Sequence, residues 1–144
     1  MSAAGSFQNP SDNRIRTILT DMKRIAVIGL SAKEDRASHG IARFLKERGF
    51  EVIGVNPVLE QKVLDLEIYP SLDDVPGTVD VVDIFRRSDQ VLPIVESAVR
   101  RGDRCVWMQE NVANPAAATV ASEAGLDVLM DVCLYKEWLR LMNG

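Results

Sequence analysis

The stretch RIAVIG, residues 24–29, decides the fold of this chain. Its apolar residues form one continuous run that is rich in β-branched side chains, too short for a helix, and ended by Gly29. A strand without apolar–polar alternation is buried on both faces, which is typical of parallel sheets. Since parallel strands need crossover connections, the run predicts a chain in which strands and helices alternate.

The sequence on both sides of this run follows that alternation. Ser11 or Asp12 can cap a first helix, whose apolar side chains continue at helical spacing to Met22. Further helices are predicted at residues 38–48, 88–101, 114–124 and 134–142. Further strands are predicted at residues 50–55, 79–85, 104–108 and 127–130, with 68–70 as a candidate short edge strand.

This pattern predicts an α/β protein with a doubly wound, five-stranded parallel sheet and helices on both faces. If the five main strands are numbered in chain order, with residues 24–29 as the first, we expect their order across the sheet to be one such as 3-2-1-4-5. The length of 144 residues predicts a single domain. We expect that domain to span residues 11–144, and residues 1–10 to form a flexible tail.

Composition and charge exclude several classes of protein. Hydrophobic residues make up 47% of the chain and charged residues 26%, which excludes wholesale disorder. The net charge of −4 argues against general binding to nucleic acid or anionic membranes, so an anionic ligand needs a locally basic pocket. Two cysteines and one histidine indicate neither a disulfide framework nor a metal site. Without a secretory signal or a long apolar segment, we expect a cytoplasmic protein.

The turn after residues 24–29 is the first candidate binding segment, because doubly wound sheets bind ligands beyond the carboxyl ends of their strands. Its candidate residues are Gly29, Leu30, Ser31, Ala32, Lys33, Arg36 and Ser38. Ser38 opens a helix whose first N–H groups lack helical partners and favour an anion. Lys33 and Arg36 add positive charge, partly offset by the two acids between them. The segment predicts phosphate binding, with an ordinary charged surface loop as the alternative.

The ends of two later strands supply further candidates. Phe85, Arg86 and Arg87 end the third predicted strand, where arginine suits phosphate oxygens and an aromatic face suits a base or ring. Solvated arginines are the alternative. Trp107 and Gln109 at the end of the fourth strand would face the same crevice, although Trp107 also suits a core position.

Asn56 and Pro57 end the second predicted strand, where an NAD-binding unit carries an acid for the ribose hydroxyl. Ser31 and Glu34 stand where the dinucleotide pattern G-x-G-x-x-G has its second and third glycines. Both departures weigh against NAD, but Asn56 would not repel a phosphorylated ribose. A small NAD(P)-binding oxidoreductase or redox sensor therefore stays open as an alternative function.

The sequence contains no self-sufficient catalytic arrangement. One histidine leaves little scope for a Ser-His-Asp triad, and neither a G-x-S-x-G elbow nor a G-x-x-x-x-G-K-[ST] phosphate loop occurs. Cys133, at the end of the last strand, is interpreted as a small buried side chain rather than a redox centre. Binding is therefore favoured over catalysis, and no catalytic or metal-ligating residue is assigned.

Five short motifs at these strand ends resemble the stand-alone CoA-binding domain family, related to the CoA-binding domain of succinyl-CoA synthetase alpha subunits. The motifs are residues 27–31, 55–57, 82–86, 107–109 and 130–133, and the likeness covers about residues 21–135. The resemblance implies a Rossmann-like sheet and coenzyme A or an acyl-CoA as ligand. Two positions depart from the family's pattern, which usually has glycine at Asn111 and often arginine at Val132. Because asparagine tolerates positive φ, we expect the turn at Asn111 to survive.

The resemblance also implies a role for each candidate. The turn from Gly29 to Ser38, with Arg36, would approach the CoA phosphates. Asn56 and Pro57 would border the adenosine, Phe85 and Arg86 would close over the nucleotide, and Trp107 and Gln109 would line the crevice toward the pantetheine arm. We therefore expect a non-catalytic or accessory CoA-binding protein. A regulatory protein that docks on a larger enzyme is a third possibility, and a homodimer is left open.

Overall fold

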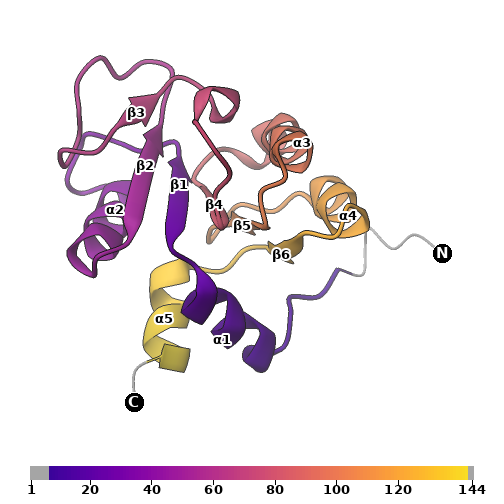
Figure 1. Ribbon diagram of the computed structural model, residues 1–144. Coiled ribbons are helices and arrows are strands. Elements are labelled where there is room, and N and C mark those ends of the chain that lie inside the picture. The colour runs from indigo at the N-terminus through magenta and orange to yellow at the C-terminus, as the bar shows by residue number, and fades with distance from the viewer. Residues whose placement is uncertain (1–6, 143–144) are drawn as a thin grey trace.

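A computed structural model describes residues 7–142 of the chain. Its core is a six-stranded parallel sheet in the order β3-β2-β1-β4-β5-β6 (Figure 1). The strands are β1 (Arg24–Ile28), β2 (Glu51–Val55), β3 (Ile68–Tyr69), β4 (Val81–Ile84), β5 (Cys105–Met108) and β6 (Asp127–Leu129). Ile28 pairs with Val55 on one side and Ile84 on the other, so β1, β2 and β4 end level with one another at the same edge.

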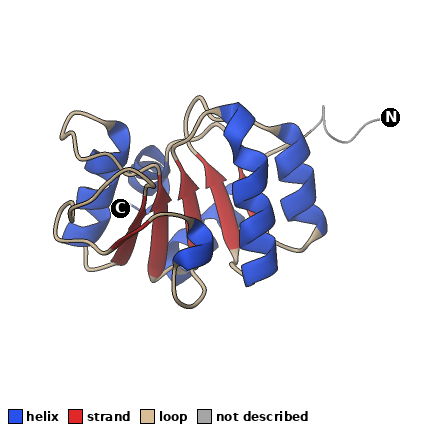
Figure 2. Ribbon diagram, turned by 90° about the horizontal axis from the view of Figure 1, so that it is seen from above, coloured by secondary structure: helices blue, strands red, loops and turns tan. Residues whose placement is uncertain are grey.

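Helices cover both faces of the sheet (Figure 2). They are α1 (Asp12–Asp21), α2 (Ala37–Glu47), α3 (Val91–Arg101), α4 (Pro115–Glu123) and α5 (Leu134–Met142), with 3-10 turns at Leu72–Asp74 and Ser88–Gln90. Buried side chains of α1, α2 and α5 form the core on one face, and those of α3 and α4 form the core on the other. This arrangement confirms the predicted doubly wound α/β fold. Within residues 7–142, no helix has both the length and the apolar character needed to cross a bilayer.

The strand count and the strand order differ from the prediction. The candidate edge piece is a sixth strand, β3, which pairs with β2 through Gly54 and Ile68. The expected order placed residues 79–85 beside β2, whereas β4 pairs with β1 and lies at the centre of the sheet. Burial explains the difference, because all four residues of β4 are buried and both residues of β3 are only half-buried.

Local signals place several helix ends as predicted, whereas α3 begins at Val91 and not at residue 88, because Ser88–Gln90 forms a 3-10 turn. Ser11 accepts a hydrogen bond from the Arg14 N–H at 3.2 Å and begins α1. Asn114 does the same for the Ala117 N–H at 3.0 Å and begins α4. Gly102, in the left-handed conformation, ends α3. Such capping groups satisfy backbone atoms that a helix end leaves without partners.

The first described residues, Phe7 and those that follow it, contact the folded domain. Residues 1–6 lie outside the described residues. Phe7 packs against the core on the α3–α4 face. The Asn9 side chain donates to the Met130 carbonyl at 3.1 Å and accepts from the Met130 N–H at 2.8 Å. Residues 7–10, expected as part of the tail, therefore join the domain that was expected to begin at residue 11.

Asp83 is a buried acid at the centre of β4. It lies between Val27 and Trp107 in the register of the sheet and is fully buried. Neither carboxylate oxygen has a hydrogen-bond partner among residues 7–142. Burial raises the pKa of the Asp83 carboxyl well above its ordinary value of 3.8, because desolvation disfavours the charged form. The folded protein therefore holds this side chain in its neutral form well above that pH.

Candidate functional site

The site begins at Gly29, where β1 ends. Gly29 has a φ of +87°, and its N–H donates to the Val55 carbonyl at 2.8 Å. A Cβ atom at this position would lie 2.4 Å from the carbonyl oxygen of Phe85. Only glycine allows both this backbone conformation and this close approach. The turn after β1 thus lies directly against the end of β4.

Hydrogen bonds hold the next residues to the start of α2. The Ser31 N–H donates to Ser38 Oγ at 3.0 Å, and His39 Nδ1 donates to the Ser31 carbonyl at 3.0 Å. The first turn of α2 contains no acid, and the N–H groups of residues 37–39 have no acceptor within the described part of the chain. Free N–H groups and the helix dipole together favour an anion at this point.

Two adjoining hollows lie at this edge of the sheet. Residues proposed from the sequence line the larger one, of about 510 Å³: Gly29, Ser31, Arg36, Ser38, Phe85, Arg86, Arg87 and Gln109. The smaller one, of about 210 Å³, lies toward β2 and is lined by Pro57. Gly29 and Arg86 line both. The larger hollow is called the cleft below. Most of the expected site residues therefore converge on one region.

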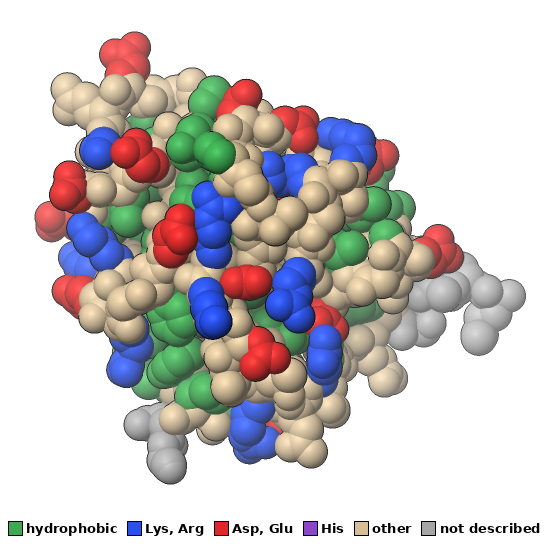
Figure 3. Space-filling model, in the orientation of Figure 1, with side chains coloured by type: hydrophobic (Ala, Val, Ile, Leu, Met, Phe, Trp, Pro, Cys, Tyr) green, Lys and Arg blue, Asp and Glu red, His purple; other side chains and the backbone are tan. Residues whose placement is uncertain are grey.

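Arginine side chains supply the positive charge of the cleft. Neither Arg36 nor Arg86 forms an ion pair within residues 7–142, whereas Arg87 pairs with Asp89 at 3.4 Å. The Arg86 stem passes over the turn, with its Cδ 3.2 Å from where a Cβ of Gly29 would lie. Lys, Arg, Asp and Glu side chains alternate over the face in Figure 3, which has no broad patch of one sign. The basic character is local to the cleft.

Two candidate residues have side chains that are buried in the core. Trp107 is fully buried, and its indole N–H donates to the Val132 carbonyl at 2.9 Å. Leu30 is also fully buried. The expectation that Trp107 lines the crevice is wrong, and the Leu30 side chain lines neither hollow. Both pack in the core on the face of the sheet that α1, α2 and α5 cover, where burial removes their large apolar surfaces from water.

Asn56 braces the turns instead of lining a hollow. Its side-chain amide donates to the Leu30 carbonyl at 2.8 Å, and its oxygen accepts from the Val58 N–H at 2.9 Å. Asn56 therefore has a structural role and lines neither hollow. Ala32 and Lys33 are exposed but line neither hollow. Of the predicted pair Asn56 and Pro57, only Pro57 lines a hollow.

Several residues that line the cleft were not assigned from the sequence. They are Ala37, Glu110, Asn111, Val112 and Cys133. Asn111 has a φ of +72°, and its N–H donates to Asp131 Oδ1 at 2.7 Å, which confirms that asparagine preserves this turn. Cys133 is half-buried at the cleft rather than buried, contrary to expectation. The signal that finds four of these residues is their position after β5 and β6, whose carboxyl ends meet the same edge, whereas Ala37 begins α2 after β1.

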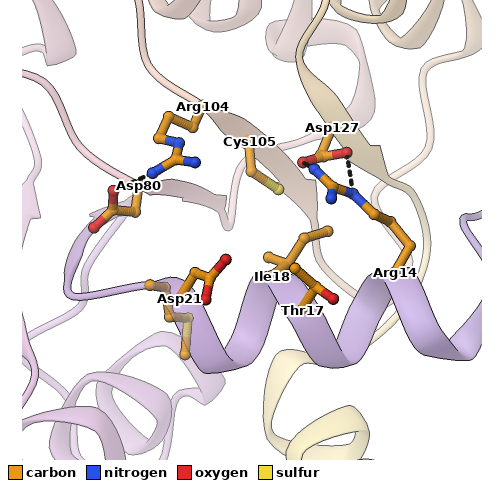
Figure 4. A pocket seen from close by; sticks show the side chains of 9 residues that line it. Arg14, Thr17, Ile18, Asp21, Asp80, Arg104, Cys105 and Asp127 are labelled. Carbon is orange, nitrogen blue, oxygen red and sulfur yellow. Dashed lines mark hydrogen bonds and ion pairs between the residues drawn. The ribbon is translucent and has the colours of Figure 1, made fainter.

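The opposite edge of the sheet contains a cavity of a different kind (Figure 4). Its volume is about 30 Å³, room for about two water molecules. Arg14 forms two hydrogen bonds to Asp127, at 3.0 and 2.6 Å, and Arg104 lies 3.8 Å from Asp80. Four of the five charged side chains that line this cavity are therefore paired, and the fifth is Asp21. Burial raises the pKa of the Cys105 thiol well above its ordinary value, which disfavours the thiolate form.

Known proteins are similar to this chain over all the residues that form its sheet. The profile of the CoA binding domain family matches residues 23–138. YneT, an uncharacterised protein of Bacillus subtilis, is 37% identical over 128 residues, which are 89% of this chain and 94% of YneT. A solved structure of a hypothetical protein from Pyrococcus horikoshii OT3 has a TM-score of 0.89 at 36% identity, covering 95% of this chain and 98% of that one.

A longer enzyme is similar in sequence to part of this chain. ADP-forming acetate–CoA ligase II of Archaeoglobus fulgidus is 33% identical over 82 residues, which are 56% of this chain and 12% of that ligase. The family match, by contrast, includes all six strands and every segment that lines the cleft. On this match, the chain belongs to the CoA binding domain family.

Proposed function

We propose that this protein binds coenzyme A or an acyl-CoA in the cleft, as a non-catalytic or accessory component. CoA carries a pyrophosphate and a 3′-phosphate, so its site needs concentrated positive charge. The observation that carries the proposal is the presence of Arg36 and Arg86 in one cleft, both without an acidic partner within residues 7–142. They flank a helix N-terminus that is itself suited to an anion.

The two hollows suggest how the ligand lies. The phosphates bind between Arg86, Arg36 and the start of α2. The adenosine lies toward Pro57 in the smaller hollow, and the pantetheine arm passes Gln109 toward Cys133. The cleft volume of about 510 Å³ is within the range of about 300–1,000 Å³ that small-molecule sites occupy.

A binding role also suits the side chains that face the cleft. The chain has one histidine, and His39 is buried with its Nδ1 bonded to the Ser31 carbonyl. His39 therefore positions the turn after β1, and no imidazole is left for acid–base chemistry at the ligand. The ionisable groups lining the cleft are Arg36, Arg86, Arg87, Glu110 and Cys133. Arginine stays protonated and serves binding rather than proton transfer.

Calorimetry at matched salt tests the proposal against the NAD(P) alternative. We expect CoA and acetyl-CoA to bind more tightly than NAD and NADPH, because Asn56 provides no carboxylate for a ribose hydroxyl and is engaged with two backbone groups. Salt must be matched because screening weakens phosphate contacts. Binding of NAD as tight as that of CoA would overturn the proposal.

We expect Arg86→Ala to weaken CoA binding by about 1.5–3 kcal/mol, or about 10- to 150-fold. The reason is the loss of charge-assisted hydrogen bonds to phosphate. Arg100→Ala is the matched control, because Arg100 lies outside the cleft, pairs with Asp73 and has a side chain that is 62% exposed. We expect Arg100→Ala to change CoA affinity less than about threefold. Titration calorimetry measures both, and unfolding curves verify that each variant folds. Equal effects of the two substitutions would refute the assignment of Arg86.

A further inference from the structure

An apolar groove between α2 and α5 adjoins the cleft. Its volume is about 490 Å³. Ala37, Glu110 and Cys133 line both the groove and the cleft. These residues come from the start of α2, the turn after β5 and the turn after β6, so the two hollows meet along a shared boundary. A ligand that lies in the cleft can continue into the groove at Cys133.

The groove has an apolar floor and a charged rim. Ile41 and Phe44 contribute from α2, and Tyr135 from α5 packs edge-on against Phe44 with ring centroids 4.9 Å apart. At the rim, Lys136 and Glu110 form an ion pair at 2.9 Å. Arg43 and Glu47 also line the groove and add one charge of each sign, so its four charged groups sum to zero. The apolar floor is the surface that a ligand would cover. An uncharged hydrocarbon group fits this chemistry.

Gly40 lies in the wall of the groove and is the fourth residue of α2. Glycine inside a helix destabilises it relative to alanine. No close contact requires glycine here, because a Cβ atom at this position has no other atom within 4 Å. Gly40 also lacks the positive φ that selects glycine elsewhere in this chain. Because Gly40 has no side chain, the groove stays open beside the cleft.

We propose that this groove holds the acyl chain of a CoA thioester, so that the protein binds acyl-CoAs with an alkyl chain of several carbons in preference to free CoA. The inference rests on the proposed function, because it needs the CoA moiety in the cleft. The thioester then lies near Cys133, where cleft and groove meet. The acyl chain extends over Ile41 and Phe44 toward Tyr135.

A series of ligands tests the inference in the intact protein. Calorimetry compares CoA, acetyl-CoA, butyryl-CoA and octanoyl-CoA at one salt concentration. Because each methylene removed from water strengthens binding about two- to fourfold, we expect octanoyl-CoA to bind at least about tenfold more tightly than acetyl-CoA. If CoA itself does not bind, the proposed function fails. If all four ligands bind equally, the proposed function stands and the acyl groove is refuted.

Substitution of Gly40 then locates the acyl chain. Gly40→Leu places a side chain in the groove, so we expect it to weaken octanoyl-CoA at least about tenfold while CoA affinity changes less than about threefold. Gly40→Ala is the control, since its single methyl group leaves most of the groove open and favours the helix. An equal loss for CoA and octanoyl-CoA in Gly40→Leu would overturn the assignment. If this variant does not fold, the ligand series on the unaltered protein still tests whether the groove binds the acyl chain.

Discussion

Replacement of Gly29 by alanine is expected to destabilise the folded protein by about 2–5 kcal/mol. Two effects add. A φ of +87° is unfavourable for any residue with a Cβ atom, at about 1–2 kcal/mol. The new methyl group would also lie 2.4 Å from the Phe85 carbonyl oxygen, a backbone atom at the end of the central strand β4. Relief of such an overlap costs about 1–3 kcal/mol.

The matched control is Gly49→Ala at the end of α2. Gly49 has a φ of +91°, but a Cβ atom there has no neighbour within 4 Å. We therefore expect Gly49→Ala to lose only the conformational part, about 1–2 kcal/mol. Urea unfolding of both variants measures the difference. If the two variants are equally stable, the close approach of β1 and β4 is not what requires glycine at position 29.

The second large effect concerns pH. The pKa of the Asp83 carboxyl is raised by burial in the folded state, and its ordinary value is 3.8. Between these two pKa values the folded state holds a proton that the unfolded state has released. The free energy of unfolding therefore falls as pH rises through this window, by up to about 1.4 kcal/mol per pH unit. Below pH 3.8, the proton is bound in both states and this loss disappears.

Asp83→Asn isolates this contribution, because the amide has a similar shape and does not titrate. We expect the variant to gain stability relative to the unaltered protein as pH rises from 4 to 7. Asp89→Asn is the control, since the Asp89 side chain is 72% exposed, and it should follow the unaltered protein. Unfolding in urea across this pH range measures the differences. Parallel curves for Asp83→Asn and the unaltered protein would contradict a neutral buried carboxyl.

The amino-acid sequence by itself determined most of the secondary structure and the edge of the sheet at which the candidate site lies. Helix ends were predictable because their signals are local: Ser11 and Asn114 cap the N–H groups three residues away, and Gly102 adopts a backbone conformation that other residues avoid. Continuous apolar runs were typical of strands in a parallel sheet. Once parallel strands were predicted, their carboxyl ends had to meet at one edge, which placed Gly29 and Arg86 near each other.

Only the tertiary structure decided which strands are neighbours and where each side chain at that edge points. The sheet puts the short β3 at its border and β4 at its centre, because burial of a whole strand depends on both neighbours and both helical layers. Trp107 and Asn56 lie at the carboxyl ends of strands, as Arg86 does. The Trp107 side chain nevertheless packs in the core, and the Asn56 side chain holds a turn by hydrogen bonds. The groove beside Gly40 exists because α2 and α5 pack together across about 90 residues of sequence. Such contacts depend on distances through space, which no local pattern of residues specifies.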